Sequence, residues 1–204
     1  RVQRAVVPAL PLCLSLAMTI GVAPLLFAQV LYGNFFYVAN ILQGWWWLGL
    51  LGIVIVIFHM LYNAWRHVAS DRPAKSRTLL IAVVLAIVAG TILIANATLT
   101  QTPEAWEQLR PRQGSALYMG DKTFAMRLAL AVSVLAAGGG IFVGALSRIR
   151  LKDDTDALAL GVRAGTLVSR IGFLGITSIG AWAVLAGSGT IFALLLGRLA
   201  LLGA

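Results

Sequence analysis

His59 is the residue of this sequence whose side chain is best suited to bind a cofactor within an apolar stretch. It lies in "IVIFHMLYNAWRH", and an imidazole nitrogen can ligate haem iron or bond to a quinone. A haem with two histidine ligands needs a second histidine at matching depth, but His67 follows outside the apolar run. We therefore expect no haem of the chain's own. His59 would ligate haem b only with a partner subunit's help; otherwise it bonds to a neighbouring helix or reaches the interface.

Gln29 raises a similar question, because its amide lies within residues 21–47, a stretch without a charged residue. An amide among apolar helices bonds to another helix, a contribution of roughly 1 kcal/mol, or contacts a bound quinone, haem edge or substrate. The sequence favours the bond between helices and leaves the cofactor contact open.

Other residues that could do chemistry are few. All seven acidic residues lie outside the apolar runs, whereas ion pumps and proton-coupled carriers usually keep a carboxylate at membrane depth. No Cys or His cluster has metal-ligand spacing, and the single Cys13 lies in the first apolar run, as a small buried hydrophobic residue would. We therefore predict no catalytic residue and no metal site.

The composition defines the elements that hold these side chains. Of 204 residues, 60% are hydrophobic and 11% are charged, with a mean hydropathy of +0.91, whereas soluble domains carry about 25% charged residues. Runs near the ~20 apolar residues that cross a bilayer predict an all-α, polytopic transmembrane helix bundle, a single domain over residues 1–204. We predict five full spans and a short C-terminal apolar helix, at about residues 8–31, 41–62, 78–99, 124–146, 165–186 and 190–204.

The connection at about residues 100–123 is long and polar, and we predict an interfacial helix followed by a loop. Pro103 suits the first turn of a helix, Thr102 the N-cap position, and Glu104 the first turn, where the helix dipole favours a carboxylate. Trp106 would then point back toward the membrane. In the uncharged first connection, Asn34 and Asn40 are predicted to cap or turn the chain.

The distribution of Lys and Arg predicts the orientation. Ten of them flank the N-terminus and the second and fourth connections, against three in the third connection and none in the first. By the positive-inside rule the N-terminus is cytoplasmic, in a bacterial inner membrane. The net charge of +9 follows from this arrangement, so a nucleic-acid partner is not expected.

Several side chains are predicted to meet lipid head groups or partner subunits. Aromatic residues at the outer ends of the spans suit an interfacial belt, and arginines near span ends suit lipid phosphates or carboxylates of another subunit. These residues are Tyr32, Trp45, Trp46, Trp47, Trp106, Arg127 and Arg170.

Small residues spaced four apart predict where helices touch, because they let backbones approach closely. The third span carries such a row at Ala82, Ala86 and Gly90, the fourth at Ala136, Gly140 and Gly144, and the fifth at Gly161, Gly165 and Ser169.

Three segments together resemble a family of bacterial polytopic membrane proteins associated with respiratory electron transfer. They are "TIGVAPLLFAQVLYGNFFY", "ANATLTQTPEAW" and "GDKTFAMR", within roughly the first 150 residues. The first segment is also faintly similar to the opening helix of cytochrome bd subunit I. Relatives carry a histidine early in the first span and another early in the fourth. Leu12 and Leu130 stand at the matching positions here, which argues against a haem bound by this chain alone.

The resemblance implies a non-catalytic membrane subunit of a respiratory or electron-transfer complex. Such a subunit would pack beside redox subunits, bind phospholipid or quinone in its grooves, and offer its outer loops to a periplasmic cytochrome-type partner. A small-solute transporter or channel, or a subunit that binds haem b through His59, remains the alternative.

Overall fold

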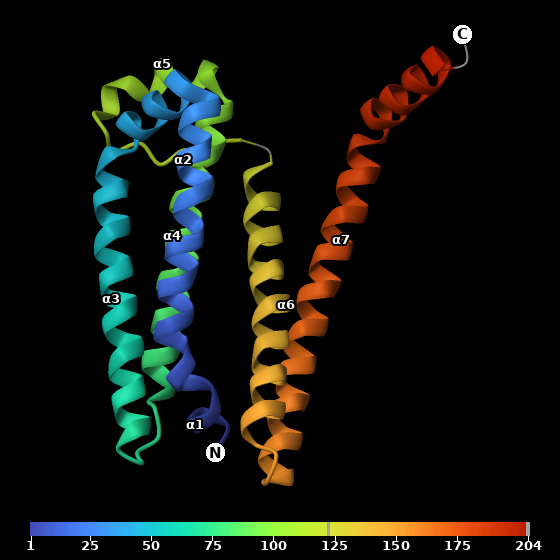
Figure 1. Ribbon diagram of the computed structural model, residues 1–204. Helices are drawn as coiled ribbons and strands as arrows, with labels where there is room; N and C mark the ends of the chain where they lie inside the picture. The colour runs from blue at the N-terminus through green and yellow to red at the C-terminus, as the bar shows by residue number, and fades with distance from the viewer. Residues whose placement is uncertain (122, 203–204) are drawn as a thin grey trace.

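The computed structural model describes residues 1–121 and 123–202, with side chains described through residue 185 (Figure 1). All regular structure in this part of the chain is helical, which confirms the all-α prediction. The elements are α1 (Val2–Val6), η1 (Val7–Ala9), α2 (Leu10–Leu42), α3 (Gly44–Ala69), α4 (Ser76–Gln101), η2 (Pro103–Ala105), α5 (Trp106–Leu109), η3 (Arg110–Arg112), α6 (Phe124–Arg150) and α7 (Thr155–Leu202).

Five helical stretches are long and apolar enough to cross a membrane, which agrees with the five predicted spans. They are Val2–Leu42, Gly44–Ala69, Ser76–Gln101, Phe124–Arg150 and Thr155–Leu185. The N-terminus, the α3–α4 loop and the α6–α7 loop lie at one end of the bundle, and the connection between α4 and α6, which contains α5, lies at the other (Figure 1). We name these the inner and outer ends after the predicted orientation, and we call the α4–α6 connection the outer connection.

The first predicted span ends later than expected. Helix α2 continues to Leu42, interrupted only at Gly33, whose φ of 44° and ψ of −118° are readily available to glycine but strained for other residues. The chain turns instead at Gln43, which separates α2 from α3. Asn34 and Asn40 therefore lie within the helical segment after the break, and the prediction that they cap or turn a connection is wrong.

Helix α7 contains the fifth predicted span and continues through the last apolar run to Leu202. The predicted helix at residues 190–204 is thus joined to the fifth span as far as Leu202. Its side chains, including Arg198, and its last two residues lie outside the described residues.

Helix α2 is packed at its two ends and free in its middle. At the inner end, Val7 of η1 joins Ala64, Val68 and Ala74 in a buried cluster, and Leu10, the first residue of α2, packs against it. At the outer end, the last turns of α2 form a second cluster with α4 and the outer connection, made by Ala39, Leu42, Leu99, Ala105, Leu109 and Ala116. Every residue from 15 to 27 is exposed, so the middle of α2 is not packed into the bundle.

Helices α6 and α7 make the most extensive helix–helix interface among the described residues, and they lie side by side near their connection (Figure 1). A Cβ added to Gly140 would lie 2.3 Å from the backbone nitrogen of Ser169, and one added to Gly165 would lie 2.6 Å from the carbonyl oxygen of Gly140. Gly140 and Gly144 of the row predicted on the fourth span therefore meet Gly165 and Ser169 of the row predicted on the fifth. Ala137, and not the predicted Ala136, continues the contact at Gly172.

The row predicted on the third span does not form a contact of this kind. Ala82 is buried, but Ala86 is exposed and Gly90 has open space where a Cβ would lie. The buried small residues of α4 are instead Ala82, Ala89 and Ala95, because α3 covers a different face of this helix.

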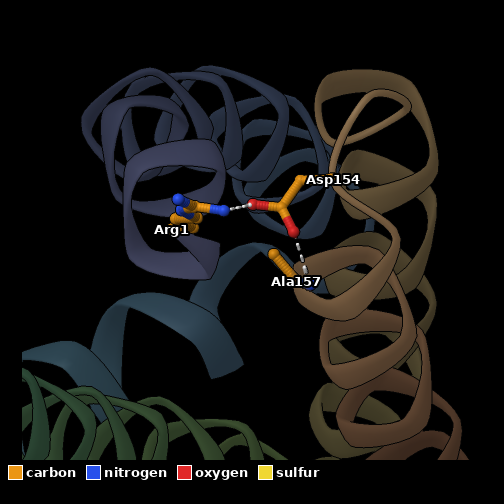
Figure 2. Close-up of polar contacts among 3 residues, drawn as sticks. All are labelled: Arg1, Asp154 and Ala157. Atoms are coloured by element: carbon orange, nitrogen blue, oxygen red, sulfur yellow. Dashed lines mark hydrogen bonds and ion pairs between the residues drawn. The ribbon is translucent and has the colours of Figure 1, made fainter.

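The N-terminal residues join two inner loops. The amide of Gln3 accepts a bond from the backbone nitrogen of Ala74 at 3.1 Å and donates to its carbonyl at 3.5 Å. Arg1 pairs with Asp154, whose carboxylate also accepts a bond from the backbone nitrogen of Ala157 at 3.0 Å (Figure 2). Asp154 thereby caps the first turn of α7 while it binds α1.

Candidate functional site

A groove of about 650 Å³ runs between α2, α3 and α4, where the unpacked middle of α2 stands beside the α3–α4 pair. A volume of this size is typical of sites for small organic ligands. Its walls come from α2 (Ala17, Met18, Gly21, Val22, Pro24, Leu25, Ala28, Tyr32, Phe36), α3 (Trp47, Leu50, Val54) and α4 (Ala89, Leu93, Asn96, Ala97, Thr100, Gln101).

The groove has an apolar length and a polar outer end. Its α2 wall from residue 17 to residue 28 is built from apolar side chains and glycine, and no residue that lines it in the described part of the chain is charged. Its polar residues, Tyr32, Asn96, Thr100 and Gln101, lie on the outer parts of α2 and α4. Pro24 contributes to the shape, because its ring removes one backbone hydrogen bond within α2.

A hydrogen-bond relay fixes the amide at this polar end. The indole nitrogen of Trp47 donates to Asn40 Oδ1 at 3.0 Å, and Asn96 Nδ2 donates to the same oxygen at 2.8 Å. An indole N–H only donates, so the Asn40 atom that faces it must be oxygen. That oxygen in turn requires Asn96 to face it with its NH₂ group. These two hydrogen bonds therefore define which side-chain atom is oxygen and which is nitrogen in both Asn40 and Asn96.

Asn96 is 4% exposed and lines the groove. Its NH₂ group is engaged with Asn40, and its Oδ1 accepts no hydrogen bond from a described residue. This oxygen is not fully enclosed, unlike the unpaired Gln43 Oε1 and Thr98 Oγ1. The side chain of Thr100 does not supply one, because its hydroxyl donates to the backbone carbonyl of Asn96 at 2.9 Å. The groove thus holds, on a buried residue at its outer end, an acceptor without a partner among the described residues.

Gln101 has its orientation set in the same way. Its Oε1 accepts a bond from Arg127 at 2.9 Å, and because a guanidinium only donates, the Nε2 of Gln101 is left as a donor. Arg127 was predicted to reach outer head groups; it lies at the start of α6, at the outer end, and binds this groove residue. Arg170 is exposed on α7.

Gln29 lines a second cavity of about 600 Å³ on α2, together with Tyr37, Asn40 and Trp47. It is half-buried, and its amide forms no hydrogen bond with another described residue. The predicted bond between helices is therefore absent from this part of the chain. Because this cavity and the groove share Trp47 and several α2 residues, Gln29 lies near the groove without lining it.

His59 lies elsewhere and is exposed. It lines a cavity of about 380 Å³ with Ser15, Thr19 and Phe58, on the side toward the inner end of α2. His67 does not face it: its Nδ1 is 2.9 Å from the carbonyl oxygen of Asn63, one turn earlier in α3. The structure thus keeps the two predicted cofactor residues, His59 and Gln29, in separate cavities.

Two of the tryptophans form hydrogen bonds with backbone carbonyls at the outer end. Trp46 donates to the carbonyl of Ser115 at 3.0 Å, and Trp106 donates to the carbonyl of Leu99 at 2.9 Å. Trp45 is 66% exposed and Tyr32 is 51% exposed, as interfacial side chains would be. The predicted short helix forms as η2, α5 and η3.

Thr102 occupies the predicted N-cap position, but its hydroxyl does not cap the helix. It donates instead to the carbonyl of Thr98 at 3.0 Å. The Thr102 hydroxyl therefore bonds to the last turn of α4, and it does not cap the helical segment that follows, as the sequence had predicted.

Two acidic residues outside the spans have lowered pKa values. Hydrogen bonds from the hydroxyl and then the backbone nitrogen of Thr123 lower the pKa of Asp121, which precedes α6. The backbone bond from Ala157, followed by the bond from Arg1, lowers the pKa of Asp154. Each carboxylate is thus stabilised in its charged form where a span begins.

Two buried polar residues were missed by the sequence analysis. Gln43 is fully buried at the α2–α3 turn, where its Nε2 donates to the carbonyl of Ile92 at 3.0 Å. Asn96 is the groove acceptor described above. Asn96 lies inside the predicted third span, so the rule that singled out Gln29, an amide within an apolar stretch, would also have found it.

Comparisons with models of protein families, with curated proteins and with solved structures gave no match to this chain.

Proposed function

We propose that this chain is a non-catalytic integral subunit of a respiratory or electron-transfer complex in the bacterial inner membrane, and that it holds a quinone or lipid in the groove between α2, α3 and α4. The groove carries the proposal. It joins a long apolar wall to a short polar end, the division of chemistry found in an amphiphile with an apolar tail. The electron-transfer context rests on the sequence resemblance.

The free middle of α2 supports a role as a subunit. Residues 15–27 present apolar side chains such as Leu16, Ile20 and Phe27, which are 52%, 70% and 65% exposed. Lipid can cover such a surface, and so can the helix of a redox subunit, which would close the open side of the groove. Gly21 and Ala23 in the same segment would let that helix approach closely.

The proposed orientation places the N-terminus in the cytoplasm. Its support is that the segments around Arg4, Arg72 and Arg150 lie at the same end of the bundle, so that positive charge collects on one side. An alkaline phosphatase fusion at Gln113 is expected to be active, because this residue would lie in the periplasm. Activity confined to a cytoplasmic reporter at the same position would overturn the orientation.

The proposal assigns no haem to the chain alone. A pyridine haemochrome assay of the purified subunit should show no haem b, because the other histidine of the chain, His67, lines a different cavity from His59. A haem signal from the isolated chain that disappears in His59→Ala would contradict this assignment and favour the haem-binding alternative.

Purification from native membranes tests the function itself. The tagged chain, extracted in a mild detergent, should bring down redox subunits that contain haem, flavin or iron–sulfur centres, identified by mass spectrometry and optical spectra. A tagged, unrelated polytopic protein from the same membranes serves as the control. Recovery of the chain without any redox protein, under conditions that keep known respiratory complexes intact, would overturn the proposal.

A further inference from the structure

We infer that the groove selects the reduced, hydroxyl-bearing form of a quinone, a hydroquinone, whose hydroxyl donates a hydrogen bond to Oδ1 of Asn96. This inference deepens the proposed function, because it rests on the groove as a site for a tailed amphiphile. To the proposed function it adds the chemical identity of the ligand's head group and its redox form.

The direction of the hydrogen bond follows from Trp47. Its N–H can only donate, so it holds Asn40 Oδ1 toward itself and leaves Asn96 with a free oxygen. A quinone presents two carbonyl oxygens, which only accept, so a quinone carbonyl facing Oδ1 would leave both oxygens unpaired. A hydroquinone presents two O–H donors. The fixed amide therefore favours the reduced form.

The lack of charge in the groove argues for a neutral head group. No described residue that lines the groove is charged, and the nearest guanidinium, Arg127, is engaged with Gln101. A phosphate drawn into this end would lose its hydration without gaining a direct ionic partner, which is costly. A hydroquinone ring carries no charge and therefore needs no ionic partner in the groove.

Gln101 supplies a complementary donor. Its Nε2 is left free by the bond from Arg127 to Oε1. A hydroxyl oxygen can accept from this amide while another hydroxyl of the ring donates to Asn96. The isoprenoid tail would follow the apolar α2 wall toward Ala17 and Met18 and leave the groove on the open side of α2.

The test compares the two redox forms on the isolated chain in lipid nanodiscs. Decylubiquinol and decylubiquinone are titrated by calorimetry, the former under argon with ascorbate. We expect the wild-type chain to bind the quinol at least tenfold more tightly than the quinone. Equal affinity, or tighter binding of the quinone, would overturn the inference.

Two substitutions examine the cause of the preference. Asn96→Leu removes the acceptor and should weaken quinol binding at least tenfold, while Asn34→Leu, outside the groove on the same end of α2, should leave it unchanged. Trp47→Phe keeps the ring but removes the N–H that orients the relay. The side-chain amides of Asn40 and Asn96 can then flip, and the ratio of quinol to quinone affinity should fall to about threefold or less.

If Asn96→Leu does not fold, Trp47→Phe still tests the inference. Its readout is the ratio of the quinol affinity to the quinone affinity, and both are measured on the same variant. A quinol preference that persists unchanged in Trp47→Phe would overturn the mechanism. Competition separates a hydroquinone from a lipid: displacement of decylubiquinol by equimolar dioleoylglycerol or phosphatidylglycerol would assign the groove to lipid. Failure of these titrations, with redox subunits still co-purifying, would reject the ligand and leave the proposed function standing.

Discussion

The α6–α7 hairpin and the α2–α3–α4 group show two ways in which apolar helices meet. In the hairpin, small residues bring the backbones together, so that an added Cβ at Gly172 would lie 2.2 Å from the backbone nitrogen of Ala137. In the other group, α2 touches its neighbours at its two ends and leaves a groove of about 650 Å³ along its middle.

The difference lies in the residues on the facing surfaces. The hairpin alternates Gly, Ala and Ser at positions where the two helices cross, and in a membrane such close packing replaces the hydrophobic effect as the source of association. Helix α2 carries larger side chains around its middle, together with Pro24, which bends or loosens a helix. One region is therefore built for stability, and the other leaves room for a ligand.

The largest expected effect comes from a large side chain in the hairpin. Gly165→Leu would place its Cβ 2.6 Å from the carbonyl oxygen of Gly140 and from the backbone nitrogen of Gly144, atoms that cannot move without separating the helices. We expect a loss of about 3 kcal/mol, the upper part of the range for overpacking, measured by SDS unfolding in mixed micelles.

Gly139→Leu is the matched control, because Gly139 lies on α6 with open space where its Cβ would be. Its free energy of unfolding should lie within about 1 kcal/mol of the wild-type value, because leucine also favours a helix over glycine. An equal loss of stability in both variants would mean that the small-residue contact does not hold the hairpin together.

The same change in the groove should leave stability intact and remove binding. Gly21→Leu has no atom within 4 Å of its new Cβ, and leucine favours a helix over glycine by roughly 0.8 kcal/mol. We expect unfolding within about 1 kcal/mol of wild type, and at least tenfold weaker binding of decylubiquinol, because the side chain would occupy the groove. Gly52→Leu, on α3 outside the groove, should bind normally.

A smaller effect is expected where α7 begins. Asp154→Ala removes the acceptor for the backbone nitrogen of Ala157 and the ion pair with Arg1, whereas Asp154→Asn keeps a capping oxygen and loses only the ion pair. Arg1 is 75% exposed, so the ion pair contributes little. Asp154→Ala should therefore melt below Asp154→Asn, and Asp153→Asn, an exposed neighbour, should match the wild type.

The pH dependence follows from the sign of the shift. The pKa of Asp154 is lowered in the folded chain, first by the Ala157 bond, so the carboxylate stabilises the fold above its unfolded pKa of about 3.9. This contribution is lost as the pH falls through the folded pKa. The difference in melting temperature between wild type and Asp154→Ala should be largest at neutral pH and shrink below about pH 4. A difference independent of pH would contradict the capping role.

The sequence predicts the hairpin better than the groove. Five spans and the small-residue rows around Gly140 and Gly165 follow from local composition and spacing, and both are found in the structure. The row at Ala82, Ala86 and Gly90 has the same spacing and does not make such a contact. Spacing along one helix cannot specify which face a neighbour covers.

The hydrogen-bond relay could not be predicted from local sequence for a similar reason. Trp47 is an aromatic residue near the end of a span, and the sequence therefore predicts that it belongs to an interfacial belt facing lipid. Its N–H binds Asn40, and Asn96, 56 residues from Asn40, completes the arrangement. Only the tertiary fold joins these three side chains, and only their bonds define which amide atom faces the groove.

The smallest expected effect is at Gln29, which tests whether the site extends beyond the groove. Gln29 lies in the neighbouring cavity and makes no hydrogen bond with a described residue, so Gln29→Leu removes no bond within the described part of the chain. We expect unfolding to change by about 1 kcal/mol or less and assembly to stay intact. Quinol binding should change less than twofold, against at least tenfold for Asn96→Leu. A tenfold loss in Gln29→Leu, with unfolding unchanged, would show that the head group lies on the Gln29 side of Trp47, and the site would then have to be redrawn around that cavity.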